Sequence, residues 1–152
     1  MTMYFDYIFN FSNVFVLPFW GAMILLPNWG LTRKVMASYI PFVVLASLYA
    51  YCFVASLDPD SLETFANPTL SQLATVFANE GITTTAWVHF IVMDFFVGRW
   101  IYWQGQESQI WTRHSLAICL FAGPLGLLSH IVTIWIAQAI AKPTSDEPTP
   151  TS

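Results

Sequence analysis

Four apolar stretches dominate this sequence, and each is long enough to cross a lipid bilayer as a helix. They cover residues 9–27, 35–57, 82–103 and 114–141. A bilayer core of about 30 Å needs roughly 20 mostly apolar residues in helical form. Charged residues make up only 9% of the chain, whereas they are roughly a quarter of a soluble domain. The sequence therefore predicts an all-α integral membrane protein, with a bundle of four antiparallel transmembrane helices over residues 1–141.

The charge balance excludes a nucleic-acid-binding protein. The net charge is −4, with only five Lys and Arg residues in 152, whereas a protein that binds nucleic acid needs a basic face to replace the phosphate counterions. The expected surroundings are instead the lipid bilayer.

The connections between the apolar stretches differ in length. The two short links, residues 28–34 and 104–113, predict antiparallel neighbouring helices. The longer middle segment, 58–81, has apolar residues at helical spacing after Asn67 and Pro68, which predict an N-cap and a first helical residue. We expect a short amphipathic helix here, and a disordered polar tail over 142–152.

The basic residues are distributed unevenly between the two ends of the predicted bundle. Arg33, Lys34 and Arg113 all lie in the short links. Because basic residues favour cytoplasmic loops, this bias predicts that both termini and the middle segment lie on the outer or lumenal side. The first residues contain no basic region and no small-residue cleavage site, so the first stretch is expected to remain in the protein rather than to be removed as a signal peptide.

The third stretch carries ionisable residues inside the membrane: His89, Asp94 and Arg99. At about 1.5 Å of rise per residue, Asp94 lies some 18 Å from Ile82, near the bilayer centre. A charge there costs roughly 3 kcal/mol, and intramembrane carboxylates commonly mark functional sites. His89 and Asp94 are five residues apart, about 140° around a helix, so their partners should come from other helices.

Counting helical rises from the ends of the stretches places further polar residues near the level of His89. They are Asn13, Tyr51 and His130, which we expect to converge with His89 on one pocket in the outer half of the bundle. The many Trp and Tyr residues are typical of interfacial belts, and they would also line a groove for a long, rigid, apolar ligand.

Three segments resemble, in order, the membrane-protein family of the plant "abscisic acid deficient" protein, which acts in neoxanthin formation. They are NVFVLPFWGAMILLPNW (13–29), WVHFIVMDFFVGRWIY (87–102) and FAGPLGLLSH (121–130). The resemblance covers residues 9–135, and its most specific part is WxHxxxxDxFxGRW in the third stretch. It implies carotenoid chemistry in a pigment-bearing membrane, the plant reaction being the isomerisation of violaxanthin to neoxanthin.

This implied reaction opens an epoxide and forms an allene, and it requires no redox cofactor and no metal. It needs a proton donor at the epoxide oxygen and a base at the adjacent C–H. Because burial favours the neutral forms of carboxyl and imidazole groups, we expect Asp94 to act as the acid and His89 as the base. Arg99 and Glu80 would set the charge at the ends of the pocket. The residues expected to contact the carotenoid are Asn13, Trp20, Glu80, Trp87, Trp100 and His130.

A non-catalytic pigment-binding protein is the alternative. His89 and His130, at similar expected depth, could ligate haem iron, and a single histidine could ligate chlorophyll magnesium. An accessory subunit of a photosynthetic or carotenoid-synthesis complex is a further reading. Because the plastid transit segment of the plant members is missing here, the resemblance favours a bacterial or cyanobacterial source, with the protein in the plasma or thylakoid membrane.

Overall fold

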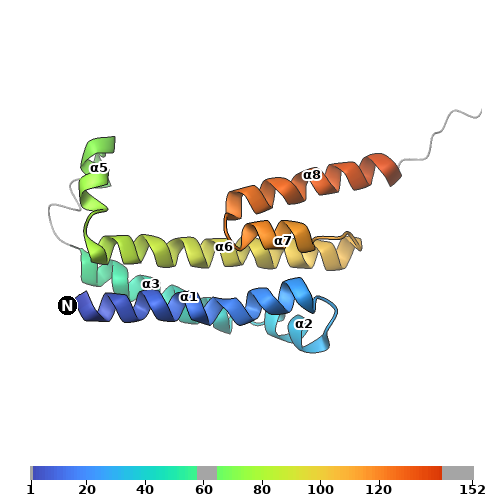
Figure 1. Ribbon diagram of the computed structural model, residues 1–152, viewed down its shortest axis with the longest axis horizontal. Helices are drawn as coiled ribbons and strands as arrows, with labels where there is room; N and C mark the ends of the chain where they lie inside the picture. The colour runs from blue at the N-terminus through green and yellow to red at the C-terminus, as the bar shows by residue number, and fades with distance from the viewer. Residues whose placement is uncertain (1, 58–64, 142–152) are drawn as a thin grey trace, which may run out of the picture.

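The fold is all-α over the residues that the structure, a computed structural model, describes: 2–57 and 65–141. Within them there are seven helices and no strand: α1 (Thr2–Leu25), α2 (Gly30–Ala37), α3 (Ile40–Ser56), α5 (Leu70–Val76), α6 (Glu80–Ser108), α7 (Arg113–Cys119) and α8 (Gly123–Ala141). The long helix α6 packs against α1 and α3 on one side and against α7 and α8 on the other (Figure 1). The all-α prediction is confirmed, and the predicted disordered tail lies outside the described residues.

Three of these helices are long and apolar enough to cross a membrane. They are α1, α6 and α8, and the count rises to four if α2 and α3 form one span, although the pair is bent by 44°. Pro41 lies in the first turn of α3, where the backbone N–H that proline lacks would have no partner within the helix. The Ser38 hydroxyl accepts a hydrogen bond from Ile40 N at 3.1 Å. These residues start a new helix, so the expected uninterrupted helix over 35–57 is instead a bent pair.

The span expected over 114–141, which Pro124 was expected to kink, is two separate helices instead, because α7 and α8 form an antiparallel hairpin. Its two helices are joined by hydrogen bonds between His114 Nε2 and Thr133 Oγ1, 2.9 Å, and between the hydroxyls of Ser115 and Ser129, 3.0 Å. At the turn, Gly126 packs directly on Cys119, where an added Cβ would lie 2.5 Å from the Cys119 Cα. Only a residue without a side chain at position 126 permits this approach of the two backbones.

The hairpin reverses the direction expected for the last helix. Gly123, at the start of α8, lies against Asp94, while His130 lies against Trp100, with ring centroids 5.3 Å apart. Residue numbers therefore rise together along both helices, and α8 runs parallel to α6. Its C-terminal end lies at the opposite end of the molecule from the N-terminus (Figure 1), so the structure does not support the prediction that both termini lie on one side.

The predicted short helix in the middle segment is present as α5, which projects from the N-terminal end of α6 (Figure 1). Its N-cap is Thr69 rather than the expected Asn67. The Thr69 hydroxyl accepts from Gln72 N, and the Gln72 side chain accepts from Thr69 N at 3.1 Å. This capping box satisfies backbone donors at both positions, which explains why the helix starts two residues later than Pro68 would suggest.

The core that fixes the site lies between α1, α3 and α6. Trp20 of α1 is 3% exposed and fits against Gly98 of α6, where a Cβ would overlap its indole ring. Phe95 is fully buried beside it and stacks on Phe42 of α3, with ring centroids 4.5 Å apart. This aromatic packing sets the positions of α1 and α3 along α6.

Candidate functional site

A cavity of about 760 Å³ lies between α1, the middle of α6 and the α7–α8 turn. Its walls are mostly apolar, and its polar and ionisable lining residues are few. Five residues predicted from the sequence lie together here: Asn13, Trp20, Trp87, His89 and Asp94. A largely apolar cavity with a few convergent polar groups is the usual form of a small-molecule site.

Asp94 occupies the junction of the cavity with the hairpin. Its carboxyl group lies so close to Gly123 that a Cβ at position 123 would overlap Oδ1. Gly123 is the first residue of α8, and the first N–H groups of a helix have no partners within it. An oxygen of the Asp94 carboxyl group therefore lies where unpaired backbone N–H groups can donate to it, which helps to accommodate this polar side chain in the middle of an apolar helix.

Cys119 supports the same junction from α7. It is fully buried, and its thiol lies 3.5 Å from the Asp94 carbonyl oxygen and 3.9 Å from that of Gly123. The position of Asp94 thus depends on the close packing of α7 against α8.

Asn13 and Trp87 join α1 to α6 at the other end of the cavity. The indole N–H of Trp87 donates to Asn13 Oδ1 at 3.1 Å, and Asn13 Nδ2 donates to the Phe9 carbonyl at 2.7 Å. Phe9 also packs on the Trp87 ring, 5.6 Å between centroids. Both residues are engaged in polar contacts, so we interpret them as fixed walls of the cavity.

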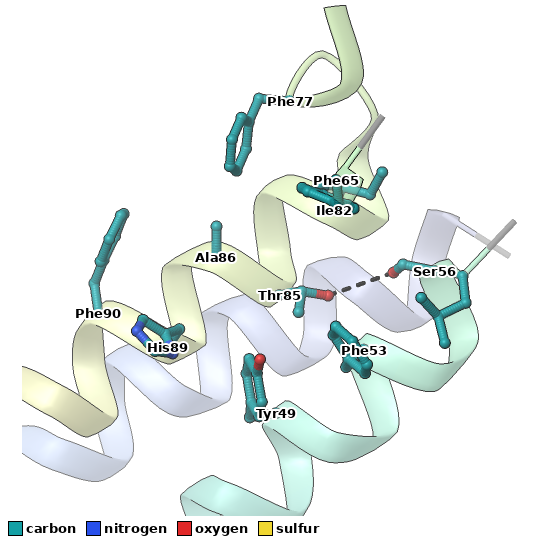
Figure 2. Close-up of a pocket in the computed structure, with 11 residues that line it drawn as sticks. Tyr49, Phe53, Ser56, Phe65, Phe77, Ile82, Thr85, Ala86, His89 and Phe90 are labelled. Carbon is teal, nitrogen blue, oxygen red and sulfur yellow. Dashed lines mark hydrogen bonds between the residues drawn. The ribbon is translucent and has the colours of Figure 1, made fainter. Parts of the chain in front are cut away.

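His89 lies at the edge of the cavity with its side chain exposed, and it also lines a second pocket on the α3 side of α6 (Figure 2). Its ring lies 5.6 Å from the ring of Tyr49, centroid to centroid. Tyr49 is thus the tyrosine of α3 that faces His89, whereas Tyr51, expected there, is 55% exposed and lines neither pocket. Among residues 2–57 and 65–141, His, Cys, Asp and Glu form no group of three that could hold a metal ion.

Arg99 lies away from the cavity. Its Nε donates to the Met36 carbonyl at 2.6 Å, and its guanidinium lies 4.7 Å from the centre of the Tyr39 ring. Met36 is in the last turn of α2, just before the break with α3, where helix carbonyls lack partners. In this arrangement Arg99 stabilises the bent α2–α3 pair and does not approach the lining residues of the cavity.

Glu80, Trp100 and His130 also lie outside the cavity. Glu80 is an exposed residue in the first turn of α6. His130 of α8 is fully buried against Trp100 of α6. Trp100 lies eleven residues after His89 on α6, which is about 16 Å of helical rise. The expectation that His89 and His130 share one depth is therefore wrong, because α8 runs parallel to α6, and the structure does not bring them together as a pair of haem ligands.

Several lining residues were not identified from the sequence. In the larger cavity these are mainly Leu120 and Phe121 of the α7–α8 turn. In the second pocket they are mainly Tyr49, Phe53 and Phe77. No local pattern distinguishes these residues from ordinary lipid-facing or packing side chains. Their role depends on the α7–α8 hairpin and on how the segment around α5 packs against α3 and α6, neither of which hydropathy predicts.

Comparison with known proteins identifies one family. The family described as ABA DEFICIENT 4-like matches residues 7–130. The chain is 37% identical over 131 residues to "Protein ABA DEFICIENT 4, chloroplastic" of Arabidopsis thaliana. The aligned region covers 83% of this chain and 60% of the plant protein. The chain thus spans about three fifths of the length of that relative. No solved structure matches this chain.

Proposed function

This chain belongs to the ABA DEFICIENT 4-like family, and on that premise we propose that it isomerises an epoxide-bearing xanthophyll within a membrane. The observation that carries the proposal is the composition of the 760 Å³ cavity, which combines apolar walls with Asp94 and His89. An apolar wall suits the polyene of a carotenoid, and the two ionisable groups suit the polar chemistry of an epoxide.

The reaction requires movement of protons and no net oxidation. In the proposed step, Asp94 donates a proton to the epoxide oxygen while the C–O bond breaks. His89 removes the proton from the neighbouring carbon, and the electron pair of that C–H bond forms the second double bond of the allene. The oxygen remains as a hydroxyl group, and transfer of the proton from His89 back to Asp94 restores the starting state.

The placement of the two groups supports this division of roles. Asp94 is half-buried beside Gly123, whereas the side chain of His89 is exposed. Although they project from different sides of α6, five residues apart, the cavity extends over Phe90 and Met93 between them. For the proposed step, the epoxide end of the substrate must lie over these two residues, between Asp94 and His89.

His89→Gln is expected to lower the isomerisation rate by about 10²-fold, the lower end of the contribution of a general base, because water can reach the edge of the cavity and replace part of its function. Gln cannot accept a proton, but it is similar in size and keeps a polar side chain. The measurement is conversion of violaxanthin by the purified protein in proteoliposomes, followed by chromatography of the extracted carotenoids.

His114→Gln is the matched control, since His114 is an exposed histidine that lines neither pocket, and the glutamine amide can still form a hydrogen bond with Thr133 Oγ1. It should convert violaxanthin at the wild-type rate. Equal rates for His89→Gln and wild type would show that His89 is not the base. A wild-type protein that binds the carotenoid without converting it would favour the pigment-binding alternative.

A further inference from the structure

A polar recess of about 240 Å³ lies at the end of the molecule where α1 leads into α2 and α6 leads into α7 (Figure 1). The two pockets described above are mostly apolar, whereas the lining of this recess is largely polar. Its polar side chains are Asn28, Gln106, Gln109, Thr112 and Arg113. The volume is below the roughly 300–1,000 Å³ of pockets that hold a whole drug-sized ligand, so the recess suits one small polar group.

Hydrogen bonds and close packing hold the walls of the recess in place. The Tyr102 hydroxyl donates to the Pro27 carbonyl at 2.8 Å, which ties the α1–α2 link to α6. Gln109 ends α6 in a left-handed conformation, with φ of 54°. After this turn Thr112 packs on Gly105, where an added Cβ would lie 2.6 Å from the Thr112 Cγ2. The recess is therefore a built part of the fold.

The recess and its rim carry positive charge. Arg113 is half-buried in the lining, with its guanidinium 5.1 Å from the centre of the Trp111 ring. Arg33 lies at the rim, where its Nη2 donates to Gln106 Oε1 at 3.0 Å. Between residues 95 and 141 the sequence has a single acidic residue, Glu107, which is exposed and does not line the recess. The charge therefore favours an anionic occupant.

The recess also contains hydrogen-bond donors that the protein does not use. Within residues 2–57 and 65–141, the Arg113 guanidinium has no acceptor oxygen as a partner and contacts the Trp111 ring instead. Asn28 accepts from Gln106 Nε2 at 3.4 Å through its Oδ1, and its Nδ2 is a second donor. A planar guanidinium can donate to two oxygens of one phosphate group. The recess thus offers the donors that bind phosphate.

Exposed aromatic and basic residues place the recess at the level of lipid headgroups when α1 and α6 cross a membrane. Trp29 and Trp111 at this end are 51% and 66% exposed, and the exposed basic residues Arg33 and Lys34 follow Trp29 in α2. Exposed tryptophans beside basic residues are typical of a membrane–water interface. Basic pockets at this level bind anionic lipid headgroups.

An apolar surface leads from the recess along α7. This helix runs from Arg113, in the recess, to Cys119, whose thiol lies 3.5 Å from the Asp94 carbonyl oxygen in the middle of α6. Along this path Ile118 and Phe121 are 40% and 86% exposed. A free phosphate ion needs no such surface, whereas the acyl chains of a phospholipid would cover it.

We propose that the polar recess binds the phosphate group of an anionic phospholipid. Arg113 and Asn28 donate hydrogen bonds to the phosphate oxygens, and Arg33 adds a second positive charge at the rim. The acyl chains lie along Ile118 and Phe121. This site is separate from the larger cavity, so the inference does not depend on which molecule that cavity binds.

The test is a titration of the purified protein, in micelles of a non-ionic detergent, with phosphatidylglycerol. A lipid that binds the folded state raises the thermal unfolding midpoint in proportion to its affinity and concentration. Arg113→Gln is expected to weaken phosphatidylglycerol binding by about tenfold or more, the loss of a hydrogen bond to a charged group. Lys34→Gln removes the same charge at the same end, outside the recess, and should bind as the wild type does.

A second variant changes the recess without changing its shape. Asn28→Asp keeps the acceptor oxygen for Gln106 but replaces the Nδ2 donor by a carboxylate oxygen. It should weaken phosphatidylglycerol binding by about tenfold. Ser108→Asp adds the same negative charge at an exposed residue of α6 outside the recess, and it should have no such effect. Because Asn28→Asp is almost isosteric, the test does not depend on how Arg113→Gln folds.

Two further titrations identify the source of the phosphate. Phosphatidylcholine, whose headgroup has no net charge, should bind more weakly than phosphatidylglycerol, and inorganic phosphate should not displace phosphatidylglycerol. Equal phosphatidylglycerol binding by the wild type, Arg113→Gln and Asn28→Asp would overturn the proposal, as would equal weakening by the two control variants. A rise in the midpoint with inorganic phosphate alone, lost in Arg113→Gln, would instead show a site for free phosphate.

Discussion

Asp94→Asn is expected to lower the rate of xanthophyll isomerisation by about 10²- to 10⁴-fold, the contribution of a positioned general acid. Asparagine has almost the same shape and keeps an acceptor oxygen for the position beside Gly123, but it has no carboxyl proton to donate to the epoxide oxygen. Because Asp94 is half-buried beside Gly123 in a mostly apolar cavity, water is a poor substitute there. The rate is measured in proteoliposomes from the carotenoids extracted at successive times.

The control for this substitution is Asp6→Asn. Asp6 is an exposed aspartate in α1 that lines neither pocket, and its replacement should leave the rate unchanged. Thermal unfolding of both variants in detergent micelles shows whether the fold is kept. Wild-type conversion by a folded Asp94→Asn protein would refute the assignment of Asp94 as the acid.

Gly126→Ala is expected to destabilise the protein by about 1–3 kcal/mol, the usual range for overpacking of a close contact. The added Cβ would lie 2.5 Å from the Cys119 Cα and 2.6 Å from the Cys119 N. Both are backbone atoms, so the contact can be relieved only if α7 and α8 move apart. Since Cys119 also lies beneath Asp94, the movement should reduce activity as well. The measurement is the thermal unfolding midpoint in detergent micelles.

Gly21→Ala provides the comparison, because a Cβ at Gly21 meets no atom within 4 Å. In the interior of α1 this substitution should be neutral or stabilise by up to about 1 kcal/mol. If Gly126→Ala unfolds at the same temperature as Gly21→Ala, the α7–α8 hairpin is not packed as described.

The apolar stretches and the ionisable residues of the third stretch were enough to predict the two long helices α1 and α6 and five residues that line the larger cavity. Asn13, Trp87, His89 and Asp94 do line one space, as the argument from depth along antiparallel helices suggested for Asn13 and His89. That argument holds for α1 and α6 because each is one continuous helix.

The same argument failed for the last stretch. Hydropathy is the same for one helix over 114–141 and for two helices folded on each other, so it cannot reveal the turn after Cys119. The close contact of Gly126 with Cys119 decides between them, and such a contact depends on residues brought together in three dimensions. His130 therefore lies beside Trp100 rather than level with His89.

Arg99 illustrates a different limit of sequence analysis. Its position in an apolar helix indicated a functional or anchoring role, but its partner is the backbone carbonyl of Met36. A carbonyl becomes available only where a helix ends, and Pro41 alone did not show that α2 ends at Ala37. Every residue has a backbone carbonyl, so the residue type does not show which one accepts a hydrogen bond from Arg99.

The most direct test of the proposed site is the absorbance spectrum, with the extracted pigment profile, of the protein purified from a carotenoid-containing membrane. The wild type should carry stoichiometric carotenoid. Ala122→Trp, which fills the larger cavity at a lining residue, should lose it, while Ala117→Trp, at an exposed residue of α7 outside both pockets, should keep it. Carotenoid retained equally by both variants, or a wild type that carries haem, chlorophyll or no pigment, would contradict carotenoid binding in this cavity.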